Sequence, residues 1–197
     1  MSLINTKVQS FKSHALKKGK FIEVTENNLK GNWSVLFFYP ANFTFVCPTE
    51  LGDLSNFYHE FKKIGVEIYS ISTDTHFAHK EWYNHSNTIS KIEFTMIGDP
   101  NGVLTRNFDV MSKKINKQEN YDEESGLAER ATFIINPDCI IKSIEINPEN
   151  VGRNASDLLN KIKAIQHVSN NPGEVCPASW NEEKATLYPS IDLIGKI

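Results

Sequence analysis

The chain has 197 residues, of which 40% are hydrophobic, and carries a formal net charge of -3. This length and composition suit one domain with a sizeable core, or one domain with a functional tail. The acidic balance argues against a nucleic-acid partner or an anionic membrane surface, because both require a basic footprint. No apolar run is long enough for a signal peptide or a membrane span, so we expect a cytoplasmic protein.

The first half of the chain alternates between strand and helix patterns. Strands are expected at residues 33–39, 66–72 and 94–98, where apolar, aromatic and β-branched residues form short runs. A helix is expected between the first two strands, and a second begins near residues 73–75 and runs through Trp82. This order predicts a parallel βαβ core with right-handed crossovers.

The second half adds antiparallel pairing and ends in a tail. Strands at 131–135 and 140–146 flank a turn-forming Asn-Pro-Asp-Cys segment, and a helix follows at about 156–167. The fold class is therefore α/β, with a central mixed sheet flanked by helices. Periodicity fades after residue 169, so we expect a domain at 1–169 and a mobile tail at 170–197. The polar stretch 112–125 is predicted as a solvated loop or an exposed helical turn.

Cys47 follows the first core strand and stands at the expected start of a helix. Unpaired backbone N–H groups and the helix dipole favour a thiolate there, which makes the residue a candidate nucleophile. If the helix has already begun at Thr44, its hydroxyl shares a face with the sulfur. Pro40 can wall off the approach without offering an N–H donor. Glu50 is either a first-turn carboxylate or a group that holds a cation.

Two other features receive structural interpretations. His76 and His79 form a His-x-x-His pattern without further ligands in spacing, so we expect a solvated helix face and no metal site. Cys139 lies at the tip of the predicted hairpin and is interpreted as a bystander.

The pattern Pro40-x-x-x-Thr44-x-x-Cys47 resembles the signature of the peroxiredoxins, thiol peroxidases of thioredoxin-like fold. The Val-Cys-Pro motif around Cys176 is similar to the resolving-cysteine motif of their typical two-cysteine class, and the block 126–133 is also similar. The resemblance implies that Cys47 is the peroxidatic cysteine and Cys176 the resolving one. It further implies a peroxide pocket and its support, formed by Pro40, Thr44, Arg130, Glu50 and Arg153.

The same resemblance implies a reaction and partners. Cys47 would reduce hydrogen peroxide and organic hydroperoxides through a sulfenic acid, then form a disulfide with Cys176 of another subunit. It implies homodimers that assemble into a decamer, no bound cofactor, and reduction by a flavin-containing NADH-dependent disulfide reductase or a thioredoxin-like donor.

Two alternatives stay open. A thioredoxin-like disulfide reductase would fit the fold, but Glu50 stands where a redox Cys-x-x-Cys motif needs its second cysteine. A non-enzymatic, chaperone-like assembly would instead use exposed hydrophobic surface to bind other proteins.

Overall fold

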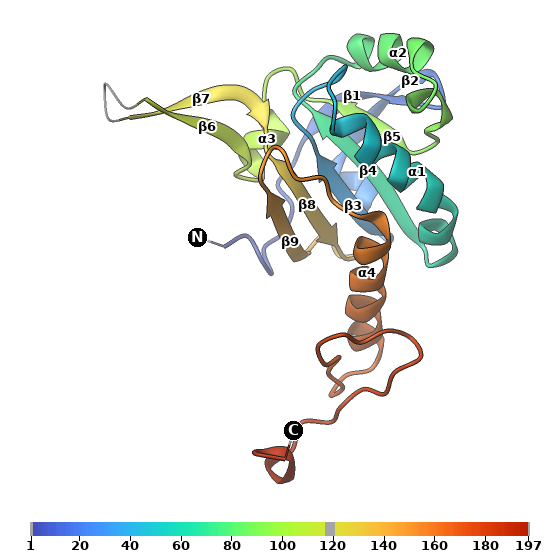
Figure 1. Ribbon diagram of the computed structural model, residues 1–197, viewed down its shortest axis with the longest axis vertical. Coiled ribbons are helices and arrows are strands. Elements are labelled where there is room, and N and C mark those ends of the chain that lie inside the picture. The colour runs from blue at the N-terminus through green and yellow to red at the C-terminus, as the bar shows by residue number, and fades with distance from the viewer. Residues whose placement is uncertain (1, 117–120, 197) are drawn as a thin grey trace. The chain divides into compact units, whose positions relative to one another are not determined.

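The computed structural model describes residues 2–116 and 121–196 (Figure 1). The chain forms two compact units, residues 1–154 and residues 155–197. The first unit contains a seven-stranded sheet and a separate two-stranded sheet. It therefore holds the mixed α/β architecture that the sequence predicts.

The large sheet has the strand order β2-β1-β5-β4-β3-β8-β9. Its centre is parallel, because β4 pairs in parallel with both β3 and β5, whereas β8 runs antiparallel to β3. The predicted mixed sheet is confirmed. Its strands are β1 (Lys12–Lys17), β2 (Lys20–Thr25), β3 (Trp33–Phe38), β4 (Val66–Ser72), β5 (Thr95–Gly98), β8 (Arg130–Ile135) and β9 (Ile141–Asn147).

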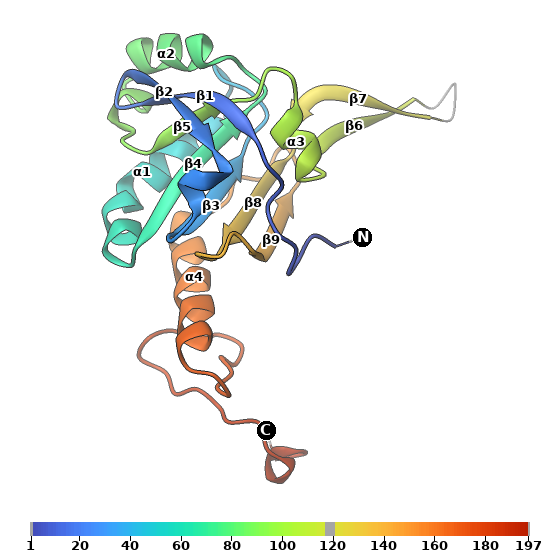
Figure 2. The same ribbon diagram turned by 180° about the vertical axis from the view of Figure 1, so that it is seen from behind.

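The described residues of the first unit form the helices α1 (Cys47–Lys63), α2 (His76–His85) and the short α3 (Val103–Asn107). Figures 1 and 2, which view the molecule from opposite sides, show α1 across one face of the sheet. Leu51, Leu54 and Phe61 of α1 are buried, as their helical spacing requires. Short 3-10 turns, η1 (Glu26–Leu29) and η2 (Ile89–Lys91), complete this unit.

An aromatic cluster fixes the central strands to each other. Phe38, Phe108 and Phe133 are buried, with ring centroids 4.7 Å apart for Phe108 and Phe133 and 5.3 Å apart for Phe38 and Phe108. The register places Phe37 of β3 opposite Thr132 of β8. Because the two strands are antiparallel, the start of β8 lies beside the end of β3.

The polar segment 112–125 was predicted as a loop or helical turn, and this is wrong for residues 112–116 and 121–125; residues 117–120 lie outside the described residues. The described parts belong to two antiparallel strands, β6 (Met111–Asn116) and β7 (Tyr121–Ala128), which project from the first unit in Figure 1. The register places Lys113 opposite Glu124, and Glu124 also pairs with Arg106 at 2.7 Å. Opposite charges on paired strands stabilise a hairpin, and hydrophobic periodicity does not detect this contribution.

The second unit begins with α4 (Ala155–Asn170), close to the predicted helix. The tail that follows contains an isolated bridge between Val175 and Leu187 and a 3-10 turn, η3 (Ile191–Leu193). The functional boundary at residue 169 and the mobility of the tail stay predictions. Among the described residues, no helix has the length and apolar character needed to cross a bilayer.

Candidate active site

Cys47 is the first residue of α1, as the sequence predicts, and its side chain is fully buried. The residue that follows β3 is still paired with the sheet, because the Tyr39 N–H donates to the Ile71 carbonyl of β4 at 2.9 Å. Pro48 occupies the first turn of α1, where the absence of an N–H costs no helical hydrogen bond. The sulfur therefore stands at the positive end of the helix dipole.

Arg130, the first residue of β8, contacts the sulfur directly. Its Nη1 lies 3.3 Å from Cys47 Sγ and donates to Glu50 Oε2 at 2.7 Å, while its Nε donates to the Glu149 carbonyl. Burial alone lowers the pKa of the Arg130 guanidinium, but the Cys47 sulfur and the Glu50 carboxylate raise it above its ordinary value. Arg130 therefore carries a fixed positive charge beside the sulfur.

Glu50 lies one helical turn after Cys47 and joins two arginines. Its Oε1 accepts from the backbone N–H and Nε of Arg153 at 2.9 and 2.8 Å, while Oε2 accepts from Arg130. Glu50, Arg130 and Arg153 are respectively 2%, 3% and 9% exposed. Of the two readings of Glu50, the geometry matches a carboxylate that holds cations.

Arg153 is itself fixed by the sheet. It donates to Thr132 Oγ1 at 3.1 Å and to the Phe38 carbonyl at 2.8 Å, and its guanidinium lies 3.4 Å from the centroid of the Phe37 ring. The bidentate geometry of a guanidinium suits such a site better than the point charge of a lysine. Strands β3 and β8 thus position Arg153, Arg153 positions Glu50, and Glu50 positions Arg130.

The charges of this buried group balance only when Cys47 is ionised. Two arginines and one glutamate give a local charge of +1 beside a neutral thiol, and zero beside a thiolate. The network therefore directs a net positive charge at the sulfur, which stabilises negative charge that develops beside it during a reaction.

An open cavity of about 610 Å³ gives access to this group. The expectation that Thr44 shares a helix face with the sulfur is wrong, because α1 begins only at Cys47. Instead the Thr44 hydroxyl donates to the Ala41 carbonyl at 3.1 Å, which leaves its oxygen able to accept a hydrogen bond. The cavity is lined by Pro40, Thr44, Phe45, Val46, Cys47, Arg130, Glu149 and Asn150.

Cys176 lies in the second unit and is half-buried, with Sγ 3.7 Å from the Ala164 carbonyl of α4. Burial and the neighbouring Glu174 raise the pKa of the Cys176 thiol, so it stays protonated at neutral pH. Glu174 accepts hydrogen bonds from Thr186 and Tyr188, and its Oε2 lies 2.8 Å from His167 Nε2. These contacts hold the tail segment before Cys176 against the end of α4 and against residues 186–188.

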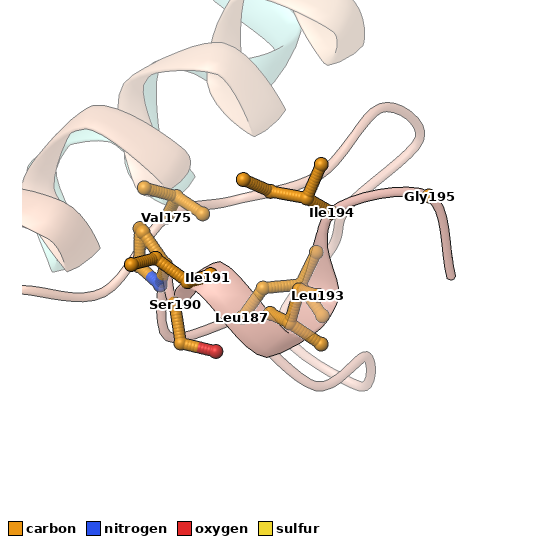
Figure 3. A pocket seen from close by; sticks show the side chains of 8 residues that line it. Val175, Leu187, Ser190, Ile191, Leu193, Ile194 and Gly195 are labelled. Atoms are coloured by element: carbon orange, nitrogen blue, oxygen red, sulfur yellow. The ribbon is translucent and has the colours of Figure 1, made fainter.

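An apolar pocket lies next to this segment within the tail (Figure 3). The bridge between Val175 and Leu187 brings the two sides of the tail together, and Ile191 and Ile194, which are largely exposed, also line the pocket. The tail around Cys176 therefore has a local apolar cluster in addition to the hydrogen bonds of Glu174.

Two further sequence expectations can be compared with the structure. The prediction of a solvated helix face is wrong for His79, which is fully buried, whereas His76 is half-buried with its ring 5.0 Å from that of His14. Cys139 is a buried free thiol at the turn between β8 and β9. In the described parts of the chain, no group of three potential ligands could hold a metal ion.

A buried cysteine at a helix start, facing an arginine at one end of a mixed sheet, is the environment of a reactive thiol whose reaction develops negative charge. The fold and the site therefore define a thiol-based α/β protein. Similarity to known proteins makes this class more specific. Residues 4–144 match the AhpC/TSA family.

Known relatives cover the entire chain. It is 60% identical to alkyl hydroperoxide reductase C of Salmonella typhimurium and 56% identical to that of Bacillus subtilis, with full coverage of both proteins in each case. The crystal structure of Enterococcus faecalis AhpC has a TM-score of 0.82 and 44% identity, covering 90% of this chain and 100% of that one. Reduced 2-Cys peroxiredoxin of Plasmodium vivax has a TM-score of 0.86 and 26% identity, covering 98% and 96%.

The chain therefore belongs to the AhpC/TSA family. It is a peroxiredoxin of thioredoxin-like fold, with thiol-dependent peroxidase activity.

Substituting Glu50 by Gln separates thiolate formation from the orientation of Arg130. Glu50→Gln removes one negative charge, so the thiolate persists, but both arginines lose their charged partner. We expect peroxide oxidation of Cys47 to slow at least about tenfold, and the folded state to lose about 3 kcal/mol. Stopped-flow oxidation, thiolate absorbance and denaturant unfolding measure the three quantities.

Glu149→Gln is the matched control, because Arg130 uses only the backbone carbonyl of that exposed residue. It should oxidise at the wild-type rate. Equal rates for Glu50→Gln and the control would contradict the positioning role of Glu50.

The tail contacts predict a pH dependence. Hydrogen bonds from Thr186, Tyr188 and His167 lower the pKa of Glu174 from 4.5 to about 2. Its stabilisation of the tail is therefore complete above about pH 4.5 and is lost as the pH falls towards 2. Protection of residues 171–190 against hydrogen exchange, relative to the unfolded chain at the same pH, should fall over this range, and should already be reduced at pH 7 in Glu174→Gln. Identical exchange at pH 7 in wild type and variant would show that Glu174 does not hold the tail.

Proposed function

We propose that Cys47 is the peroxidatic cysteine and that Arg130 stabilises the transition state of its oxidation. The observation that carries this proposal is the contact of 3.3 Å between Arg130 Nη1 and Cys47 Sγ at the base of an open cavity. A hydroperoxide in this cavity would place its terminal oxygen near the sulfur and its second oxygen near the guanidinium. Pro40 and Thr44 complete the wall, with the Thr44 oxygen accepting the peroxide O–H.

The chemical step is a nucleophilic displacement on oxygen. The Cys47 thiolate attacks the terminal oxygen, an S–O bond forms, and the O–O bond breaks with its electron pair on the leaving oxygen. The terminal oxygen keeps its proton as the sulfenic acid, and the leaving oxygen gains a proton to become water or an alcohol. Arg130 lowers the barrier by neutralising charge that develops on the leaving oxygen.

Cys176 is proposed as the resolving cysteine of another subunit in a homodimer. Its thiol attacks the Cys47 sulfenic acid, giving a disulfide and water. The raised pKa of Cys176 keeps its thiol from competing with Cys47 for peroxide, and the thiol gives up its proton as it attacks the sulfenic acid, so that the leaving hydroxide becomes water. Cys47 is fully buried, so disulfide formation requires the first turn of α1 to open locally.

The relatives' name, alkyl hydroperoxide reductase C, supports hydroperoxides as substrates and a reductase as partner. We propose that this reductase is a flavin-containing, NADH-dependent disulfide reductase or a thioredoxin-like donor, and that homodimers assemble into a decamer. The three free cysteines are consistent with the expected cytoplasmic location.

The two cysteines have separable roles that single substitutions test. Cys47→Ser should abolish peroxide consumption with a disulfide-reducing system, because no nucleophile remains. Cys176→Ser should consume one equivalent of peroxide, accumulate sulfenic acid at Cys47, and form no Cys47-Cys176 disulfide. Peroxide assays and intact-mass spectrometry measure both outcomes, with Cys139→Ser as the matched control that should turn over normally.

Full peroxidase turnover by Cys47→Ser would contradict the proposal. The two remaining alternatives give different results in the same experiment. A disulfide reductase would reduce disulfide substrates without peroxide, and a chaperone-like assembly would suppress aggregation equally well with and without Cys47.

A further inference from the structure

We infer that His79, a buried residue of α2, is a positioning residue for the peroxide site, acting through the side chain of Asn42. This inference rests on the proposed role of Cys47 and adds a residue outside the Cys47-Arg130-Glu50-Arg153 network. His79 contacts neither the sulfur nor either arginine in any described hydrogen bond. Its connection runs through the loop between β3 and α1.

The hydrogen bonds fix the tautomer of His79. Its Nε2 lies 3.0 Å from the Ile97 carbonyl, which can only accept, so Nε2 carries the proton. Burial lowers the pKa of His79, so the ring is neutral at physiological pH and Nδ1 is an acceptor. The Asn42 amide nitrogen lies 2.9 Å from this Nδ1. His79 therefore accepts a hydrogen bond from the Asn42 amide and donates one to the Ile97 carbonyl of β5.

Asn42 is held on its other side as well. Its Oδ1 accepts from the Tyr39 hydroxyl at 2.8 Å, and its backbone N–H donates to Asp74 Oδ2 at 2.8 Å. Tyr39 and His79 are fully buried and Asn42 is 7% exposed. The hydrogen bonds form a series in which each group donates to the next, from Tyr39 to Asn42, from Asn42 to His79, and from His79 to the Ile97 carbonyl. Replacing an acceptor in this series leaves a buried donor group unpaired.

The loop beyond Asn42 needs such an anchor. Phe43 adopts a positive φ of 56°, which is unfavourable for a residue with a large side chain, and its ring packs 5.8 Å from that of Trp82. Thr44 follows immediately, and Cys47 is five residues after Asn42 (47 − 42 = 5). Fixing the Asn42 amide therefore limits the positions of Thr44 and Cys47 relative to Arg130.

Two substitutions of similar polarity separate the two hydrogen bonds of His79. In His79→Asn, the amide oxygen replaces Nδ1 and keeps an acceptor for Asn42, while the bond to Ile97 is lost. In His79→Gln, the amide nitrogen replaces Nε2 and keeps the donor to Ile97, while Asn42 loses its acceptor. A purely structural role makes the two variants equivalent, whereas positioning through Asn42 makes only His79→Gln defective.

The measured quantity is the second-order rate constant for oxidation of Cys47 by hydrogen peroxide, in variants that show wild-type folding by circular dichroism. We expect His79→Gln to lose about tenfold, as for one buried hydrogen bond, and His79→Asn to stay within about twofold of wild type. In an Asn42→Ala background the difference between the two variants should vanish. Equal rates for His79→Gln and His79→Asn in the protein that keeps Asn42, or a slower His79→Asn, would overturn the inference.

If a His79 variant does not fold, Tyr39→Phe provides a second test of the Asn42 anchor. It removes the hydroxyl that donates to Asn42 Oδ1 and that also lies 3.5 Å from His79 Nδ1, and it should slow Cys47 oxidation about threefold to tenfold. An unchanged rate would contradict the role of the Asn42 anchor. These outcomes are distinct from failure of the proposed function, which active Cys47→Ser protein would show regardless of His79.

Discussion

The site depends on one buried carboxylate, Glu50, which pairs with both Arg130 and Arg153. Without Glu50, two guanidinium groups would be buried side by side at the edge of the sheet, a costly arrangement. With it, three separate segments of chain meet: the first turn of α1, the start of β8 and the segment after β9. The remaining positive charge is directed at Cys47, so the requirement for charge balance and the requirement for a thiolate are satisfied together.

This arrangement serves the transition state more than the thiolate. An ordinary cysteine, with a pKa of about 8.5, is about 3% ionised at pH 7, so full ionisation gains about 30-fold in reactive form. A more acidic thiol is also a weaker nucleophile, which offsets part of any such gain. Orientation of the peroxide and neutralisation of the leaving oxygen must provide most of the rate, and Arg130 is placed for both.

The sequence predicted those parts of the structure that local patterns determine. The parallel core, the β8-β9 hairpin and the helix start at Cys47 follow from apolar periodicity and turn residues. The β1-β2 hairpin was missed because lysines interrupt its apolar pattern, and β6-β7 was predicted wrongly because cross-strand charges stabilise it. The partners of Glu50 could be named only through family resemblance, since Arg130 and Arg153 lie 80 and 103 residues away in the chain. His79 looked solvated because the polar Asn42 and Ile97 groups that satisfy it are distant in sequence.

The most direct measurement of the central claim compares Arg130→Lys with wild type. Lysine keeps a positive charge near the sulfur but lacks the planar fork that joins Cys47, Glu50 and the Glu149 carbonyl. Thiolate absorbance at neutral pH should stay near the wild-type value, while the rate constant for hydrogen peroxide should fall about a hundredfold. A rate constant within about twofold of wild type would show that positive charge alone is sufficient, and would contradict the account.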